Sequence, residues 1–160
     1  MGMYGTYVAI SNQELAAIEK EATSLYDVDS DFRLDIDKSW EALHYTLCND
    51  IADGEPPMGN VVPMNMDNAL DLDEMEFGAF ALPLEEVKEA YEYMLTIDKE
   101  KLRSMYNFEE MVKEEIYPLS GMEEDNGNDF FNYLYENFES IKIFYKEVLE
   151  KNMSIVFYIS

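Results

Sequence analysis

The chain has one cysteine and one histidine in 160 residues. A disulfide needs two cysteines, and a zinc site built from Cys and His needs several of these ligands. The same scarcity leaves few ways to place a base beside a nucleophile. We therefore expect no disulfide, no metal site and no cofactor. A binding protein is favoured over an enzyme, which stays open as an alternative.

Positive charge is also scarce. The 11 Lys and Arg residues stand against 35 Asp and Glu, which gives a formal net charge of −24 at pH 7. A surface with this charge repels phosphate backbones and anionic lipids.

The N-terminus lacks the pattern of a signal peptide, and no apolar run approaches the length of about 18 residues typical of a membrane span. The sequence thus argues against nucleic-acid and membrane partners and predicts a cytoplasmic protein.

Apolar residues are plentiful, at 48% of the chain, and aromatic residues make up 14%. A length of 160 residues is close to the usual size of one domain. Residues 1–160 are therefore expected to form a single domain with one principal core.

The two segments most typical of buried strands are the two ends of the chain, residues 4–10 and 154–160. Apolar residues three and four positions apart predict helices between them, at 11–25, 38–49, 84–95 and 129–152. Ser11 with Glu14 forms a capping box, and Asp98 and Asn107 are expected to cap two short helices. Residues 50–80 hold three of the five prolines and are predicted as a long surface loop, with a short strand around 75–80.

The terminal strands need partners for their backbone groups, so they must pair with each other or with a shared neighbour. The predicted fold class is α/β (mixed): a single domain with a small mixed central sheet that includes both terminal strands, covered by about five or six helices.

The second predicted helix carries the residues with the most chemistry. Trp40, His44 and Cys48 recur at four-residue steps and so share one face. Asp37 is the expected N-cap. A Cys one turn below a His usually points parallel to it, so we assign no catalytic residue here. The favoured interpretation of His44 is a packed side chain with one satisfied nitrogen, and a proton shuttle with Asp35 or Asp37 is the alternative.

Residues 27–38 imitate a calcium-binding loop, with Asp at the first, third, fifth and ninth positions. The sixth position needs Gly and has Phe32, while the twelfth needs a bidentate Glu and has Lys38. We predict no calcium site here, and weak binding of a divalent ion stays open.

Residues 27–76 contain 14 Asp and Glu but only two Lys or Arg. One interpretation is a solvated face that keeps the protein soluble. The other is a docking surface for a basic partner, because a field of one sign accelerates encounter with the opposite charge. Interleaved methionines and Phe77 would add adaptable apolar contacts. The candidate partner-binding residues are Asp53, Glu55, Asp67, Asp71, Asp73, Glu74 and Glu76.

Six short segments form a pattern along the whole chain: residues 1–3, 34–40, 43–45, 116–118, 144–145 and 155–159. By these segments and their order, the chain resembles the YfbM-like family of bacterial proteins. It implies a single cytoplasmic α/β domain of unknown function. Residues 78–81 lack the Pro and Arg that the family often has, so no anion-binding arginine is expected there. The matching segments point to a candidate pocket formed by Asp35, Asp37, Trp40, His44 and Tyr117.

The expected function is that of a non-enzymatic acidic protein-binding domain. Its specific form is an immunity-type factor that occludes a basic partner, an expectation that rests on analogy. The alternative is a small-molecule-binding protein or enzyme that uses the candidate pocket, and it requires an accessible His44. DNA mimicry is a third possibility and needs carboxylates spaced like phosphates. The sequence does not predict an oligomeric state.

Overall fold

The computed structural model describes residues 2–20, 24, 25, 28, 31–72, 75, 77–121 and 126–160. Its centre is a four-stranded sheet with the strand order β2-β1-β4-β3. The strands are β1 (Gly5–Ile10), β2 (Arg33–Asp35), β3 (Ala79–Leu82) and β4 (Ser154–Ile159). The three pairings between these strands are antiparallel. The fold therefore combines helices with a sheet whose described strand pairs all run antiparallel.

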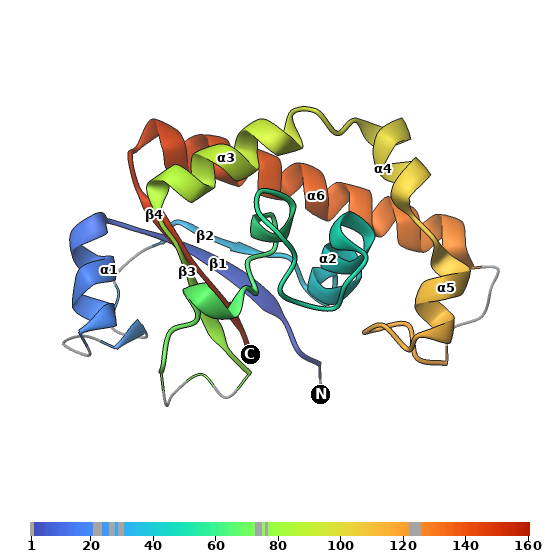
Figure 1. Ribbon diagram of the computed structural model, residues 1–160, viewed down its shortest axis with the longest axis horizontal. Coiled ribbons are helices and arrows are strands. Elements are labelled where there is room, and N and C mark those ends of the chain that lie inside the picture. The colour runs from blue at the N-terminus through green and yellow to red at the C-terminus, as the bar shows by residue number, and fades with distance from the viewer. Residues whose placement is uncertain are drawn as a thin grey trace.

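The two terminal strands are the two central strands. They pair along their whole length, from Gly5 opposite Ile159 to Ile10 opposite Ser154. Beyond them, the backbone groups of Tyr4 and Ser160 exchange two hydrogen bonds of 2.8 and 3.0 Å. The two chain ends therefore lie side by side (Figure 1). This confirms the prediction that the ends of the chain build the sheet.

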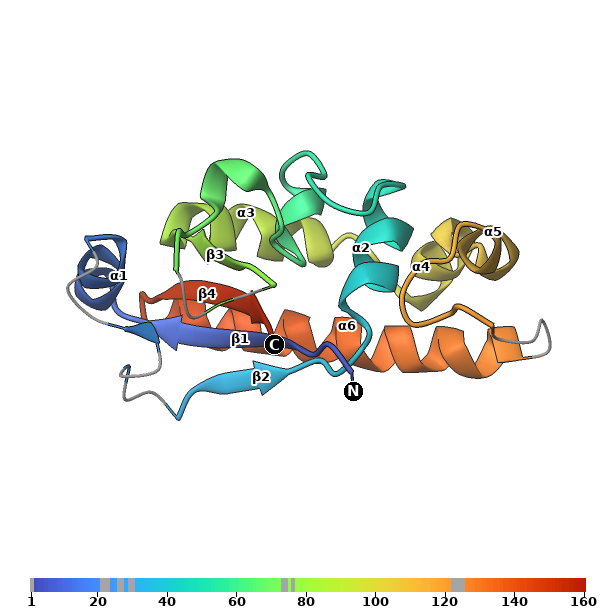
Figure 2. The same ribbon diagram turned by 90° about the horizontal axis from the view of Figure 1, so that it is seen from below.

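Helices pack around this sheet and extend beyond it. The α-helices are α1 (Asn12–Glu19), α2 (Trp40–Cys48), α3 (Leu84–Met94), α4 (Lys99–Met105), α5 (Phe108–Lys113) and α6 (Gly127–Glu150), and the short 3-10 helices are η2 (Met58–Asn60) and η3 (Met66–Asn68). Helices α1 and α5 lie at opposite ends of an elongated molecule (Figures 1 and 2). The predicted fold class is confirmed, as are the capping box that opens α1 and the side-chain caps Asp98 and Asn107.

The sheet has a different core on each face, because alternate strand residues point in opposite directions. Tyr7, Phe157 and their neighbours on that face pack with α2 to α6, and we call this the large core. Val8 and Val156 face the other way and pack with Ile18 of α1 and with loop residues, which we call the small core.

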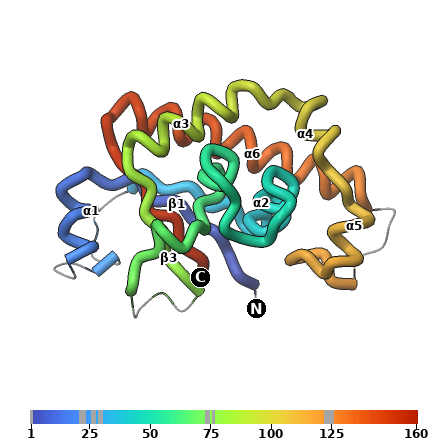
Figure 3. Tube along the Cα trace, in the orientation of Figure 1, coloured from blue at the N-terminus to red at the C-terminus, as the bar shows by residue number. Residues whose placement is uncertain are grey.

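The predicted surface loop is wrong for residues 59–64, which are buried. Two buried hydroxyls hold this segment against the large core. Tyr7 donates to the Val61 carbonyl at 2.7 Å, and Tyr145 of α6 donates to the Asn60 carbonyl at 2.7 Å. Because irregular backbone can be buried only when its polar groups are paired, these bonds permit the burial. Figure 3 shows the segment passing between α2 and β3.

Strand β2 was not predicted. It occupies part of the calcium-like segment, and Leu34 pairs with Tyr7 of β1. Asp27 and Asp29 of that segment lie outside the described residues, as do residues 21–23, over which the first helix was predicted to continue. The described part of that helix ends at Glu19.

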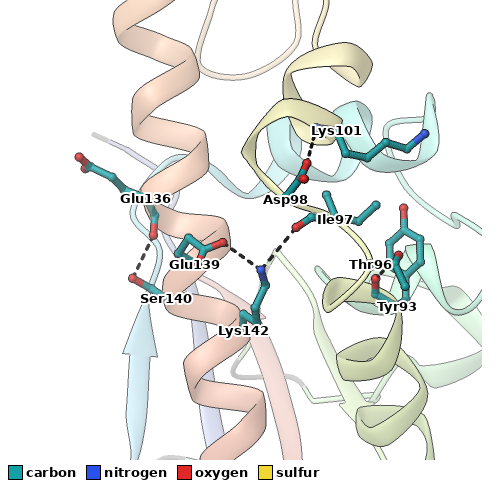
Figure 4. Close-up of polar contacts among 9 residues, drawn as sticks. All are labelled: Tyr93, Thr96, Ile97, Asp98, Lys101, Glu136, Glu139, Ser140 and Lys142. Atoms are coloured by element: carbon teal, nitrogen blue, oxygen red, sulfur yellow. Dashed lines mark hydrogen bonds and ion pairs between the residues drawn. The ribbon is translucent and has the colours of Figure 1, made fainter.

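One surface contact ties the turn between α3 and α4 to α6. Lys142 Nζ bonds Glu139 on its own helix at 2.9 Å and the Ile97 carbonyl at 3.4 Å (Figure 4). The Lys142–Glu139 pair is the one ion pair among the residues that the structure describes. In the sequence, 35 Asp and Glu residues outnumber 11 Lys and Arg residues, so the chain has few cations to pair with its carboxylates.

Candidate functional site

The turn after β2 places Asp35 and Asp37 close together. The Asp35 carboxylate accepts a hydrogen bond of 2.6 Å from the Asp37 backbone N–H. Asp37 has a φ of 55°, a left-handed conformation that Asp tolerates better than most residues. The predicted N-cap is wrong: Ser39 precedes α2, and no side chain caps the helix. The reason is that the Asp37 carboxylate accepts instead from Tyr133 of α6, at 2.7 Å.

A hollow of about 460 Å³ lies beside Asp37. Its lining combines apolar groups with both signs of charge, from Asp37, Lys38, Pro118, Asn126, Asp129, Phe130 and Tyr133. The Tyr133 hydroxyl accepts from the Lys38 N–H at 3.0 Å while it donates to Asp37. Burial and the Asp37 carboxylate both raise the pKa of Tyr133, so the hydroxyl stays protonated at neutral pH.

Trp40 and Tyr117 are brought together, but their polar atoms are already used. Their rings lie 5.6 Å apart. Trp40 Nε1 donates to the Met3 carbonyl at 2.9 Å, and the Tyr117 hydroxyl accepts from the Met3 N–H at 2.9 Å. Glu41 accepts from the Tyr117 N–H, while burial raises the pKa of the Glu41 carboxyl. The pair therefore clamps the N-terminal segment to α2.

His44 lies apart from the Asp37 hollow. Its side chain is 0% exposed, and it is not among the described residues that line the Asp37 hollow. Its Nδ1 lies 2.9 Å from the Asp50 carbonyl oxygen, whereas its buried Nε2 has no hydrogen-bond partner in the part of the chain that the structure describes. Burial lowers the pKa of His44, against opposing effects from Asp50 and Asp53. The enzyme alternative requires an accessible His44, whereas His44 is buried in the structure.

Cys48 lies one turn further along α2. It is a half-buried free cysteine. Burial, with a smaller contribution from the Asp50 carboxylate, raises the pKa of its thiol to about 12. Because the thiolate is the nucleophilic form, this thiol is not activated for catalysis at neutral pH.

The acidic candidates divide into three groups. Asp53 orients η3 by accepting a hydrogen bond of 2.7 Å from the Met66 N–H, and Glu55 is exposed. Asp67 and Asp71 line a shared hollow. Asp73, Glu74 and Glu76 lie outside the described residues.

The acidic hollow, as we call it, has a volume of about 360 Å³ and lies where α1, η3 and α3 meet. Four carboxylates line it: Glu19, Asp67, Asp71 and Glu86. Ile18, Leu70, Leu72 and Ala81 add apolar surface, and no Lys, Arg or His is among the described residues that line it. Glu19 and Glu86 are not predictable from the sequence as members of this site, because only the fold brings their helices to residues 67–72. A hydrogen bond of 2.8 Å from Asn68 fixes Glu86.

A second hollow with acidic residues in its lining lies alongside α3. It is formed by Pro56, Pro57, Glu89, Glu92 and Tyr93 and has a volume of about 370 Å³. Both acidic hollows border α3, so negative charge extends along this helix.

In the described ranges, no group of three or more His, Cys, Asp and Glu side chains is arranged to hold a metal ion. Likewise, none of the helices in these ranges is both long and apolar enough to span a bilayer.

The fold and the site define a small α/β domain with an acidic face and a buried histidine. A family profile described as "Domain of unknown function (DUF1877)" matches residues 1–158, and the chain belongs to this family. It is similar to the crystal structure of a protein of unknown function, YfbM from Escherichia coli, with a TM-score of 0.81 and 20% sequence identity over 98% of this chain and 99% of that one. At this identity the likeness shows the fold. The resemblance to the YfbM-like family is thereby confirmed. No curated protein matches the chain.

Proposed function

We propose that this domain is a non-enzymatic protein-binding module that takes a basic segment of a partner protein in the acidic hollow. The observation that carries the proposal is the lining of that hollow, in which four carboxylates accompany apolar side chains and no Lys, Arg or His is among the described lining residues. A lysine or arginine side chain fits this chemistry, because its methylene stem packs on apolar surface while its charged end meets carboxylates.

The immunity-type role is the specific form of this proposal. In that role the acidic face covers a basic surface of a toxin. Its support is the combination of a large single-sign field, which raises association rates, with the exposed apolar side chain of Met66, next to Asp67 of the hollow.

The experiment is a titration of the isotopically labelled protein with a short arginine-rich peptide, followed by NMR. Resonances of residues 67–72 and of Glu86 are expected to shift, and affinity is expected to fall with ionic strength. The double variant Asp67→Asn/Asp71→Asn should bind about tenfold more weakly, a loss of about 1.4 kcal/mol.

The matched control removes two carboxylates at the far end of the molecule, in Glu109→Gln/Glu114→Gln on and just after α5. It reduces the net negative charge by the same amount and should change affinity much less. Equal losses for the two double variants would mean that the peptide responds to net charge alone, and the acidic hollow would then be rejected as the binding site.

A small-molecule-binding role is favoured by one observation, the Asp37 hollow, whose volume lies in the range typical of ligand pockets. A small aromatic amine used as the probe should shift the resonances of Asn126 and Tyr133, and Tyr133→Phe should weaken its binding. Binding without shifts at these residues would exclude this hollow.

A further inference from the structure

His44 and Cys48 point toward the same place. They lie one turn apart on α2, which puts them on one face. The loop after the helix brings Gly54 against both. A Cβ built on Gly54 would clash with Cys48 Sγ and would lie 3.0 Å from His44 Nε2. The thiol sulfur and the imidazole nitrogen therefore converge beside the Gly54 backbone, where any other residue would fill the space.

The second nitrogen of His44 fixes the state of the first. Nδ1 lies 2.9 Å from the Asp50 carbonyl oxygen, which can only accept a hydrogen bond. Nδ1 therefore carries the ring proton, and Nε2 is left with a lone pair. That lone pair is buried and has no hydrogen-bond partner among the described residues, which is rare for a polar atom inside a protein. Metal-binding histidines show the same arrangement, with one nitrogen bonded to a backbone carbonyl and the other free for the metal.

We propose that His44 Nε2 and Cys48 Sγ form a two-ligand site for a soft monovalent cation, of the class of Cu(I) and Ag(I). Thiolate and imidazole are donors that soft ions prefer. A tetrahedral zinc site needs four ligands, whereas no third His, Cys, Asp or Glu joins this pair within the described ranges.

The charge of the ion follows from the burial of the site. When the ion binds, the S–H bond breaks, an S–metal bond forms, and the proton leaves for solvent. A monovalent ion then leaves the site as neutral as the thiol was, whereas a divalent ion would leave a net positive charge among buried groups, at high desolvation cost. Cys48 is half-exposed, which gives the ion a route from solvent.

The test exploits the fact that the chain has one histidine and one cysteine, so each signal has one source. The folded protein, labelled with nitrogen-15, is titrated with one equivalent of Ag(I). The Nε2 resonance of His44 should shift strongly while its Nδ1 proton is retained. Cu(I) affinity is then measured without oxygen, in competition with a coloured chelator.

Cys48→Ser should abolish one-to-one binding of either ion, and His44→Gln should weaken it at least tenfold. Met66→Leu, which removes a highly exposed thioether, is the matched control and should leave affinity unchanged. An unmoved Nε2 resonance would overturn the proposal even if His44→Gln fails to fold. Unchanged affinity in a folded His44→Gln variant would also overturn it, since the ion would then bind the thiol alone.

Discussion

The two faces of the central sheet differ in what packs against them. The large core joins β1, β3 and β4 to five helices and contains buried polar groups, among them His44 and the hydroxyls of Tyr7 and Tyr145. The small core has α1 and loop residues on the other face, and part of it forms the floor of the acidic hollow. Stability should therefore depend mainly on the large core, while binding should depend on the thinner packing of the small one.

The largest effect is expected in the middle of the large core. Phe157 is fully buried in β4, with its ring 4.8 Å from that of Tyr7. Phe157→Ala should lower the free energy of unfolding by about 3–5 kcal/mol, through lost burial and a cavity. Denaturant titration measures the change. The control is Phe77→Ala, at a ring that is 51% exposed, which should cost no more than about 0.5 kcal/mol. Similar losses for both variants would contradict the assignment of the large core.

A matched isoleucine pair compares the two cores directly. Ile18 of the small core and Ile141 of the large core are 1% and 0% exposed. Truncation to Ala should cost about 2–5 kcal/mol at either site, with the smaller loss at Ile18, where the neighbouring hollow allows the structure to collapse. Binding of the arginine-rich peptide should weaken in Ile18→Ala and remain unchanged in Ile141→Ala. The reverse pattern would mean that the small core does not support the acidic hollow.

Elements whose signal is local were predictable from the sequence. The terminal strands and the helices 84–95 and 129–152 have their apolar residues at the right spacing, and Asp98 and Asn107 cap helices as expected. Strand β2 does alternate, with Phe32, Leu34 and Ile36 at every second position, but the segment was compared only with a calcium-binding loop, and no strand is predicted there. Its three residues are held by pairing with β1, which no local pattern reveals.

The candidate site was only partly predictable for a similar reason. Asp67 and Asp71 belong to an acidic stretch that is visible in the chain, whereas Glu19 and Glu86 reach the same hollow from distant helices. The stripe that joins Trp40 to His44 is real on α2, yet the two side chains serve different places, one the N-terminal segment and the other the loop at Asp50 and Gly54. Helical spacing predicts a shared face but not what covers each part of it.

Loss of one hydroxyl should have an intermediate effect, and it should differ between two tyrosines of the large core. The Val61 carbonyl accepts from both Tyr7 and Tyr145, while Asn60 depends on Tyr145. Tyr145→Phe should therefore cost about 1–3 kcal/mol, the range for a buried group left unpaired. Tyr7→Phe should cost less, because Tyr145 still reaches Val61. Thermal and denaturant unfolding of the two variants test this order, and a larger loss in Tyr7→Phe would contradict it.

The smallest expected effect is a pH dependence that belongs to the large core. Because burial lowers the pKa of His44, the unfolded chain takes up a proton below about pH 6.5, where the native chain does not. Above this pH, His44 is neutral in both states and does not lower the free energy of unfolding. As pH falls from there toward the lower native pKa, the free energy of unfolding decreases by up to about 1.4 kcal/mol per pH unit. Glu41 acts in the opposite direction: its raised native pKa adds stability as pH falls through that value. Relief of repulsion among the surface carboxylates adds stability in the same sense.

The difference in unfolding free energy between wild type and His44→Gln isolates the contribution of the histidine, and it should become less favourable to wild type between pH 7 and 5.5. A flat difference would mean that His44 is as easily protonated in the native chain as in water, and the contrast between the two cores would lose its electrostatic part.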